Sequence, residues 1–156
     1  MIDDILSKYV FFDVDGTLSE YRYRDKVYGG ELYGTGCQSL HDLLFADLFI
    51  SARPLKTMQN IVSQLDRDRI FILGAAECNH EIEQKYIWLE KNYPQFRREN
   101  IFFISNTMHK PEVIIEYCNH YSIPLYEVAF VDDRIDVIRK AESMGIKSFH
   151  PSSFVP

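Results

Sequence analysis

The sequence predicts an α/β fold, a Rossmann-like parallel sheet of about five strands with helices on both faces. Apolar runs of strand length, rich in β-branched and aromatic residues, alternate along the chain with amphipathic stretches of helical period. The runs are apolar throughout, which is typical of strands buried on both faces of a parallel sheet. Strand–helix–strand repeats form right-handed crossovers, so the carboxyl ends of all the strands should share one edge.

The spacing of the apolar residues predicts where each element lies. Strands are expected at residues 9–13, 70–73, 101–104, 128–131 and 146–149. Helices are expected at residues 39–49, 54–65, 80–92, 111–121 and 134–144. Pro54 and Pro111 should lie in the first turns of their helices, and Gly145 should end the last helix. Tyr86 and Tyr121 are expected to face the core.

The chain length of 156 residues predicts one domain, residues 1–156, with enough chain to bury a hydrophobic core. An insertion at about 19–52 interrupts the alternation of strands and helices. Its first part, residues 19–36, holds four glycines, and its tyrosines are interleaved with basic residues. A loop of this length in a compact domain often has a function, so a small lid is one interpretation. A solvated loop whose tyrosines cover the core is the other.

The charge balance limits the classes of partner. The sequence has 17 basic and 23 acidic residues, a formal net charge of −6. This argues against a nucleic acid polymer or an anionic membrane, because both require a basic surface. A small phosphorylated substrate is compatible, since a local cation can override the overall repulsion. With no membrane-length apolar stretch, no evident signal peptide and three widely spaced cysteines, the expected location is cytoplasmic, with reduced thiols.

Acidic residues stand at the ends of two expected strands. Asp13 and Asp15 follow the first strand, and Asp132 and Asp133 follow the fourth. Because these strand ends share the edge where ligands bind in open α/β sheets, the carboxylates are expected to converge. Crowded carboxylates repel one another unless a cation or a proton holds them together. Hard oxygen ligands of this kind suit Mg²⁺, which is the expected cofactor.

The spacing around these acids excludes a calcium-binding loop and limits a purely structural role in turns. In an EF-hand with Gly16 at the sixth position, Phe11 would occupy the first ligand position and Arg22 the last, and neither can bind calcium. Turn and N-cap preferences of aspartate account in part for Asp133, which precedes a helix. They do not account for Asp13, which still lies on an apolar strand.

Two motifs together resemble those of the haloacid dehalogenase (HAD) superfamily of phosphohydrolases. They are residues 11–18 (Phe-Phe-Asp-Val-Asp-Gly-Thr-Leu) and, at a later strand end, residues 131–133 (Val-Asp-Asp). The resemblance covers roughly residues 8–150 and implies a Rossmann-like sheet with the first strand at its centre. An aspartate two residues after the first is typical of the family's phosphatases and phosphotransferases. Its dehalogenases lack that residue, so cleavage of a carbon–halogen bond is disfavoured.

The resemblance implies a separate role for each acid. Asp13 would be the nucleophile that forms an aspartyl-phosphate. Asp15 would protonate the leaving group and later activate water, while its backbone carbonyl binds Mg²⁺. Asp13 and Asp132 would supply carboxylates to the same ion, with Asp133 in a supporting position. Such chemistry requires a cation beside the attacking carboxylate and an acid that later becomes a base.

The family pattern also contains a lysine and a phosphate-binding turn. Lys110 fits the lysine best, because it precedes a helix and lies 22 residues before Asp132. Its ammonium would offset the repulsion between carboxylates and stabilise the transferred charge. Phosphate is expected to contact Lys110 and the backbone at Gly16, Gly74 and Ala75.

Gly74 departs from the pattern, because the family usually ends the second strand with a Ser or Thr whose hydroxyl binds phosphate. Loss of a comparable transition-state donor costs about 10²–10³ in rate. Candidate substitutes are Ser51, Ser105, Asn106 and Thr107. If the missing hydroxyl limits the rate, Gly74→Thr is expected to raise turnover.

The leading hypothesis is a Mg²⁺-dependent phosphomonoesterase that acts on a small phosphorylated metabolite. Residues 88–91 and 131–134 weakly resemble 5′-nucleotidases of the superfamily, and tyrosines of the insertion could stack on a base. A HAD-fold module that binds phosphate or Mg²⁺ without turnover is the alternative that Gly74 motivates. A phosphotransferase would use the same residues. The short insertion implies a minimal cap, so the site is either open or closed by a partner subunit, and an oligomer is compatible with the sequence.

Overall fold

A computed structural model describes residues 2–20 and 49–156 of the 156-residue chain. Within these residues, five strands form one parallel sheet in the order β3-β2-β1-β4-β5, with β1 at the centre. The strands are β1 (Tyr9–Phe12), β2 (Ile70–Ala75), β3 (Ile101–Ile104), β4 (Val128–Val131) and β5 (Lys147–Phe149). The α-helices are α4 (Lys56–Ser63), α5 (Asn79–Asn92), α6 (Lys110–Tyr121) and α7 (Ile135–Ser143). The 3₁₀ helices are η1 (Ile2–Asp4), η2 (Arg98–Asn100), η3 (Thr107–His109), η4 (Leu125–Glu127) and η5 (Pro151–Phe154). The predicted fold class is confirmed. Residues 39–48 of the helix expected at 39–49, and the tyrosines of residues 21–36, lie outside the described residues.

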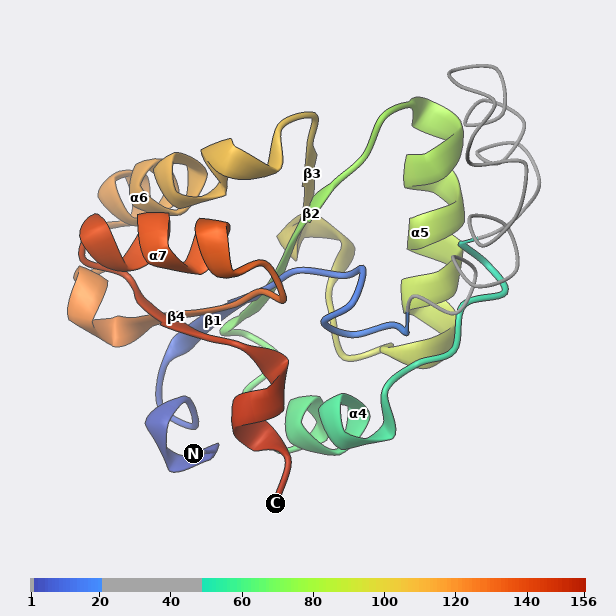
Figure 1. Ribbon diagram of the computed structural model, residues 1–156, viewed down its shortest axis with the longest axis horizontal. Helices are drawn as coiled ribbons and strands as arrows, with labels where there is room; N and C mark the ends of the chain where they lie inside the picture. Colours follow the sequence, from blue (N-terminus) through green and yellow to red (C-terminus); the bar gives the residue numbers. More distant parts are fainter. Residues whose placement is uncertain (1, 21–48) are drawn as a thin grey trace.

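Helices cover both faces of the sheet (Figure 1). On the face covered by α4 and α5, Trp88 belongs to the same buried cluster as Val10 and Phe12 of β1. On the face covered by α6 and α7, Ile114 belongs to the same cluster as Phe11. Successive strand residues point to opposite faces, so β1 contributes to both cores. This explains why its sequence is apolar throughout.

The register of the sheet brings the carboxyl ends of β1 and β4 side by side. Phe12 pairs with Val131, so Asp13 and Asp132 leave their strands at the same level. The backbone N–H of Asp13 donates to the carbonyl of Val131 at 2.9 Å, and that of Asp132 donates to the carbonyl of Phe149 at 3.1 Å. The sheet therefore holds the backbone of both acidic residues in place.

Two details of the predicted helices are wrong. Pro54 lies before α4 rather than in its first turn, because it forms an isolated bridge with Ser19 and Leu55 is the N-cap. Tyr121 does not face the core: it is 58% exposed at the last residue of α6 and lies against the Tyr117 ring, with ring centroids 4.5 Å apart.

The inward face of α5 also differs from the predicted apolar stripe. Its buried residues are Glu81, Gln84, Lys85, Trp88 and Leu89. Tyr86 is only half-buried, with its ring edge-to-face against Phe103 at 5.5 Å. Charged side chains can occupy a buried face when they are paired and hydrogen-bonded. Glu81 and Lys85 meet this condition, because they pair with each other at 2.7 Å.

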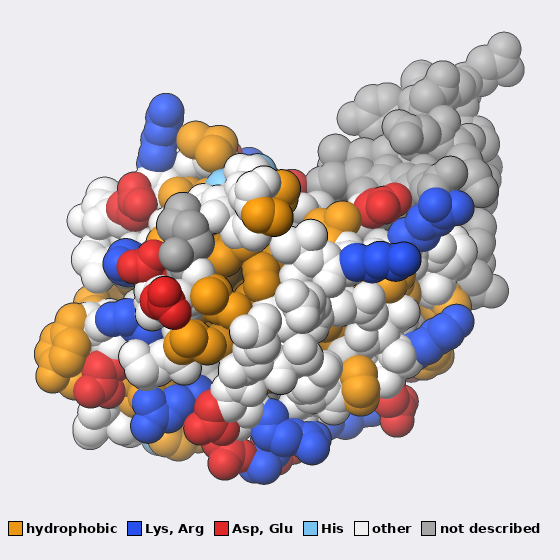
Figure 2. Space-filling view, turned by 90° about the horizontal axis from the view of Figure 1, so that it is seen from below, with side chains coloured by type: hydrophobic (Ala, Val, Ile, Leu, Met, Phe, Trp, Pro, Cys, Tyr) orange, Lys and Arg blue, Asp and Glu red, His pale blue; other side chains and the backbone are white. Residues whose placement is uncertain are grey.

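No helix in residues 2–20 and 49–156 has the length and apolar character needed to cross a membrane. Cys78 and Cys118 are free thiols, and Cys37 lies outside the described residues. On the face shown in Figure 2, acidic and basic side chains are interspersed around a central hydrophobic area.

Candidate functional site

A buried lysine lies between two aspartates at the carboxyl ends of β1 and β4. Lys110 Nζ is 2.7 Å from Asp13 Oδ1 and 2.9 Å from Asp132 Oδ2. Lys110, Asp13 and Asp132 are 1%, 6% and 0% exposed, in that order. Lys110 comes from the first turn of α6, and the strands supply the aspartates. The structure therefore joins three residues that the sequence assigned to the site.

Asp13 is held through both carboxylate oxygens. Its Oδ2 accepts a hydrogen bond from Thr17 Oγ1 at 3.1 Å, while Oδ1 faces Lys110. Gly16 has a φ of +78°, which lies in the left-handed region that glycine adopts readily. This turn brings the buried Thr17 back toward Asp13. Gly16 thus shapes the loop that orients the carboxylate, and Thr17 is a site residue that the sequence analysis missed.

The charges of the cluster change the pKa values of its members. Burial lowers the pKa of Lys110, but attraction to Asp13 and Asp132 outweighs burial and raises the pKa above its ordinary value. Burial, followed by repulsion from Asp13, raises the pKa of Asp132 to about 6. Lys110 and the backbone N–H of Arg134, which donates to Asp132 Oδ1 at 2.9 Å, oppose that rise. The cluster therefore keeps its ammonium while the Asp132 carboxylate is costly to ionise without a further cation.

Three carboxylates of the site could hold a metal ion. Oxygen atoms of Asp13, Asp132 and Asp133 all lie within 4.8 Å of one another. Ligands on opposite sides of a Mg²⁺ ion would be about 4.2 Å apart, so small side-chain rotations would suffice. An all-oxygen donor set also suits a hard divalent cation. Asp133, half-buried beside the pair, offers a third ligand oxygen.

The Asp15 side chain is engaged elsewhere. Its Oδ2 lies 2.6 Å from the Nζ of Lys85 on α5, and the side chain is 24% exposed. Lys85 also pairs with Glu81 at 2.7 Å. The sequence analysis missed Lys85 and Glu81. The only signal was their i, i+4 spacing, which commonly marks a solvated ion pair on a helix surface.

The carboxyl end of β2 shows why glycine is present at position 74. A β-carbon on Gly74 would lie 2.9 Å from Cε1 of Phe103 and 3.5 Å from Cγ2 of Val14. The Phe103 ring therefore occupies the space that a Ser or Thr would need. At the end of the same strand, the Ala75 carbonyl accepts a hydrogen bond from Lys85 Nζ at 2.9 Å.

One of the suggested substitutes for the missing hydroxyl is already engaged. Asn106 caps η3, with its side-chain oxygen accepting from the Met108 N–H at 3.0 Å. Ser105 is exposed just after β3, and Thr107 begins η3. The structure therefore gives Asn106 a local structural role.

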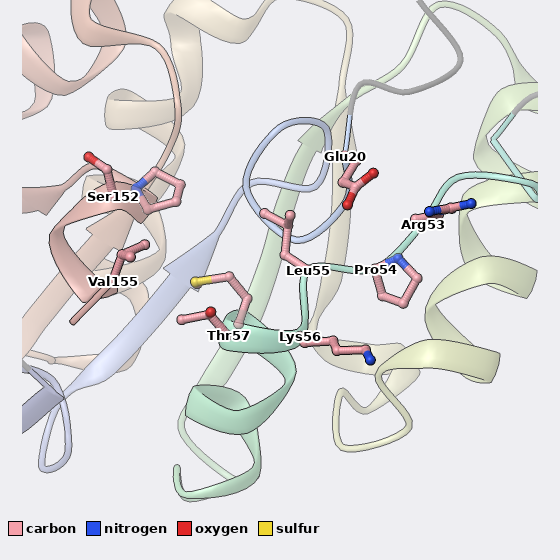
Figure 3. Close-up of a pocket in the computed structure, with 10 residues that line it drawn as sticks. Glu20, Arg53, Pro54, Leu55, Lys56, Thr57, Ser152 and Val155 are labelled. Atoms are coloured by element: carbon pink, nitrogen blue, oxygen red, sulfur yellow. The ribbon is translucent and has the colours of Figure 1, made fainter.

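A cavity of about 490 Å³ lies between the start of α4 and η5 (Figure 3). Leu55 and Val155 are among its lining residues, which include none of Asp13, Lys110 and Asp132. Its lining combines apolar residues with the charged side chains of Glu20, Arg53 and Lys56. We therefore assign the chemistry to the carboxylate cluster and not to this cavity.

Comparisons with known proteins identify the fold. No family model matches the sequence, and no curated protein matches it. Among solved structures, a HAD family enzyme from Bacteroides thetaiotaomicron in complex with magnesium has a TM-score of 0.55 and 16% identity, over 94% of this chain and 93% of that one. A haloacid dehalogenase-like family hydrolase from Xanthomonas campestris has a TM-score of 0.61 and 11% identity, over 92% and 82%. A putative beta-phosphoglucomutase from Bacteroides vulgatus has a TM-score of 0.58 and 10% identity, over 94% and 76%. The chain thus has the fold of HAD-family hydrolases, as the motifs indicated.

Proposed function

We propose that this chain is a Mg²⁺-dependent phosphomonoesterase that acts through an aspartyl-phosphate on Asp13. The observation that carries the proposal is the buried Asp13–Lys110–Asp132 cluster, with contacts of 2.7 and 2.9 Å at the carboxyl edge of the sheet. A structural role alone would be served as well by apolar residues, since a buried ion pair is often no more stabilising than they are. Two carboxylates and one ammonium at a ligand-binding edge are instead suited to phosphoryl transfer.

In the first step, a carboxylate oxygen of Asp13 attacks the phosphorus of the substrate as the bond to the leaving oxygen breaks. Thr17 and Lys110 hold the two oxygens of Asp13, so little reorganisation is needed for the attack. Lys110 also offsets the negative charge of the arriving phosphate. The product of this step is a phosphorylated Asp13 and a free alcohol, whose oxygen has taken a proton from Asp15.

In the second step, water attacks the phosphorus of the aspartyl-phosphate. Asp15, now a carboxylate, accepts a proton from that water, and the bond between phosphorus and Asp13 breaks. Inorganic phosphate leaves and both aspartates return to their starting states. The Asp15 side chain is 24% exposed, so the attacking water can approach it from the solvent.

The carboxylates of Asp13, Asp132 and Asp133, with the backbone carbonyl of Asp15, would hold the Mg²⁺ ion. The ion would supply positive charge that neutralises the carboxylates and the phosphate together. Support comes from the HAD family enzyme of Bacteroides thetaiotaomicron, whose solved structures include a complex with magnesium and inorganic phosphate at a TM-score of 0.53 and 15% identity. The substrate we propose is a small phosphorylated metabolite, with nucleotides as one class to test.

Gly74 favours a second candidate, a module that binds Mg²⁺ or phosphate with little turnover. The Phe103 ring crowds the position that a β-carbon would take at residue 74, and glycine carries no hydroxyl, so one transition-state donor is missing from β2. The paired Asp13 and Lys110 favour the enzyme instead. Phosphotransfer to a second alcohol would use the same first step, and it differs only in the acceptor.

The test is phosphate release from a panel of nucleotides, sugar phosphates and p-nitrophenyl phosphate with Mg²⁺. The wild type should release phosphate, and Asp13→Asn should lose at least about 10³-fold in rate because the nucleophile is gone. Asp68→Asn, an exposed aspartate paired with Arg97, is the matched control and should keep full activity. No release by the wild type would refute the enzyme proposal, and release retained by Asp13→Asn would refute the mechanism. An alkyl phosphate formed from added glycerol would identify phosphotransfer.

A further inference from the structure

A second buried lysine lies next to the site, outside the Asp13–Lys110–Asp132 cluster. The Lys85 side chain is only 2% exposed. Its Nζ contacts Asp15 Oδ2 at 2.6 Å, Glu81 Oε2 at 2.7 Å and the Ala75 carbonyl at 2.9 Å. An ammonium has three N–H donors, so these three acceptors satisfy it fully. Lys85 thus joins α5 and the end of β2 to the loop that follows Asp13.

The surroundings hold Lys85 in this position. The centroid of the Phe49 ring lies 4.7 Å from Lys85 Nζ. The backbone N–H of Phe49 donates to Gln84 Oε1 at 3.3 Å. Glu81 is anchored as well, because its Oε1 accepts from the Glu77 N–H at 3.2 Å. Any displacement of the ammonium would break several of these contacts at once. Lys85 is therefore held in one position, in which it can orient the carboxyl group of Asp15.

The contact with Lys85 makes the two oxygens of Asp15 unequal. Among the described residues, the hydrogen bond to the Asp15 side chain is made through Oδ2. The other oxygen, Oδ1, is thereby left to exchange a proton with a substrate or with water. Glu81 offsets the charge of Lys85, so the carboxyl group of Asp15 does not face an uncompensated cation.

We propose that Lys85 is a positioning residue, which anchors Asp15 Oδ2 so that Oδ1 faces the leaving oxygen of the substrate. This role rests on the proposed phosphomonoesterase function. It acts on one event, the transfer of a proton from Asp15 to the leaving oxygen as the bond from that oxygen to phosphorus breaks. The loss of Lys85 should therefore matter most for substrates whose leaving group needs that proton.

Two substrates separate this role from a merely structural one. p-Nitrophenyl phosphate releases a stable aryloxide that needs no proton, whereas glycerol 2-phosphate releases an alkoxide that does. kcat/KM is the constant to compare, because it reports the steps up to formation of the aspartyl-phosphate. A positioned general acid contributes about 10²–10⁴ in rate. Lys85→Met should lower kcat/KM for glycerol 2-phosphate at least about 10-fold more than for p-nitrophenyl phosphate.

A second variant controls for a folding defect caused by Lys85→Met. Lys85→Met alone leaves the buried Glu81 unpaired, so Lys85→Met/Glu81→Gln removes both charges while keeping similar volumes. The double variant should show the same selective loss on glycerol 2-phosphate, with a wild-type circular dichroism spectrum. Lys147→Met, a substitution of an exposed lysine paired with Asp4, should leave both rates unchanged.

The outcomes separate this inference from the function on which it rests. Selective loss on glycerol 2-phosphate in a folded variant supports the positioning role. Equal losses on both substrates, or no loss, would overturn the role of Lys85 and leave the phosphomonoesterase proposal standing. No phosphate release by the wild type from these two substrates or from any other phosphomonoester of the panel would overturn both.

Discussion

Replacing Lys110 by Met tests whether this lysine holds two buried carboxylates together. Met is similar in length and carries no charge, so Asp13 and Asp132 would face each other without a cation. They are 6% and 0% exposed, so water cannot readily screen them. Removal of one partner from a buried ion pair costs about 3–5 kcal/mol. For a chain of this size, that loss corresponds to a fall of about 6–20 °C in Tm.

The assay is thermal and urea unfolding followed by circular dichroism, first in EDTA and then with millimolar Mg²⁺. In EDTA, Lys110→Met should unfold at the correspondingly lower temperature. Mg²⁺ should raise the Tm of the variant more than that of the wild type, because the ion then neutralises carboxylates that have lost their ammonium. A double variant, Asp13→Asn/Lys110→Met, should be less destabilised than the two single changes predict when added, because their residues are in contact.

A control and two contrary outcomes complete this experiment. Lys147→Met removes an exposed ion pair with Asp4, whose side chains are 53% and 39% exposed, and should leave the Tm close to that of the wild type because water and salt screen exposed charges. If Lys110→Met were as stable in EDTA as the control, the reasoning about buried charge would be refuted. If Mg²⁺ stabilised neither the wild type nor Lys110→Met, the carboxylates would not form a metal site.

Two further predictions concern pH and the end of β2. Burial and Asp13 raise the pKa of Asp132 from an ordinary 3.8 to about 6, so ionisation costs folding free energy. In EDTA, the contribution of Asp132 to the free energy of unfolding is therefore fully present below about pH 4. It is lost as the pH rises through about 6, and the total loss is up to about 3 kcal/mol. Urea titrations should show this fall in the wild type relative to Asp132→Asn, and parallel curves would contradict it. Gly74→Ser should lower the free energy of unfolding by about 1–3 kcal/mol, because its β-carbon meets the Phe103 ring. Adding Phe103→Leu should recover part of that loss and allow the new hydroxyl to raise turnover; equal stability of Gly74→Ser and wild type would show that the ring moves freely.

The outline of the fold follows from local sequence patterns. The apolar runs at residues 101–104 and 128–131 became strands with those bounds. β4 is buried at all four positions, as expected of a strand covered on both faces, whereas the edge strand β3 is fully buried only at Ile101. The approach of Asp13 to Asp132 was also predictable, since parallel strands place their carboxyl ends at one edge. Helix faces were less predictable: the spacing on α5 selected Tyr86, and the fold buried Glu81 and Lys85 instead.

The sequence by itself therefore determined the α/β class and the edge at which the acids gather, and its motif resemblance implied the central position of β1. The motif resemblance already placed Lys110 with these acids. Tertiary structure alone decided that Lys85 pairs with Asp15, because a charge can be buried only beside a partner, and these partners are distant in the chain. Lys110 meets Asp13 across 97 positions, and Lys85 meets Asp15 across 70. Tertiary structure likewise accounts for Gly74, since the ring that excludes a side chain there belongs to Phe103 on the neighbouring strand. Periodicity records which residues are apolar, whereas the environment of a polar group depends on segments that only folding brings together.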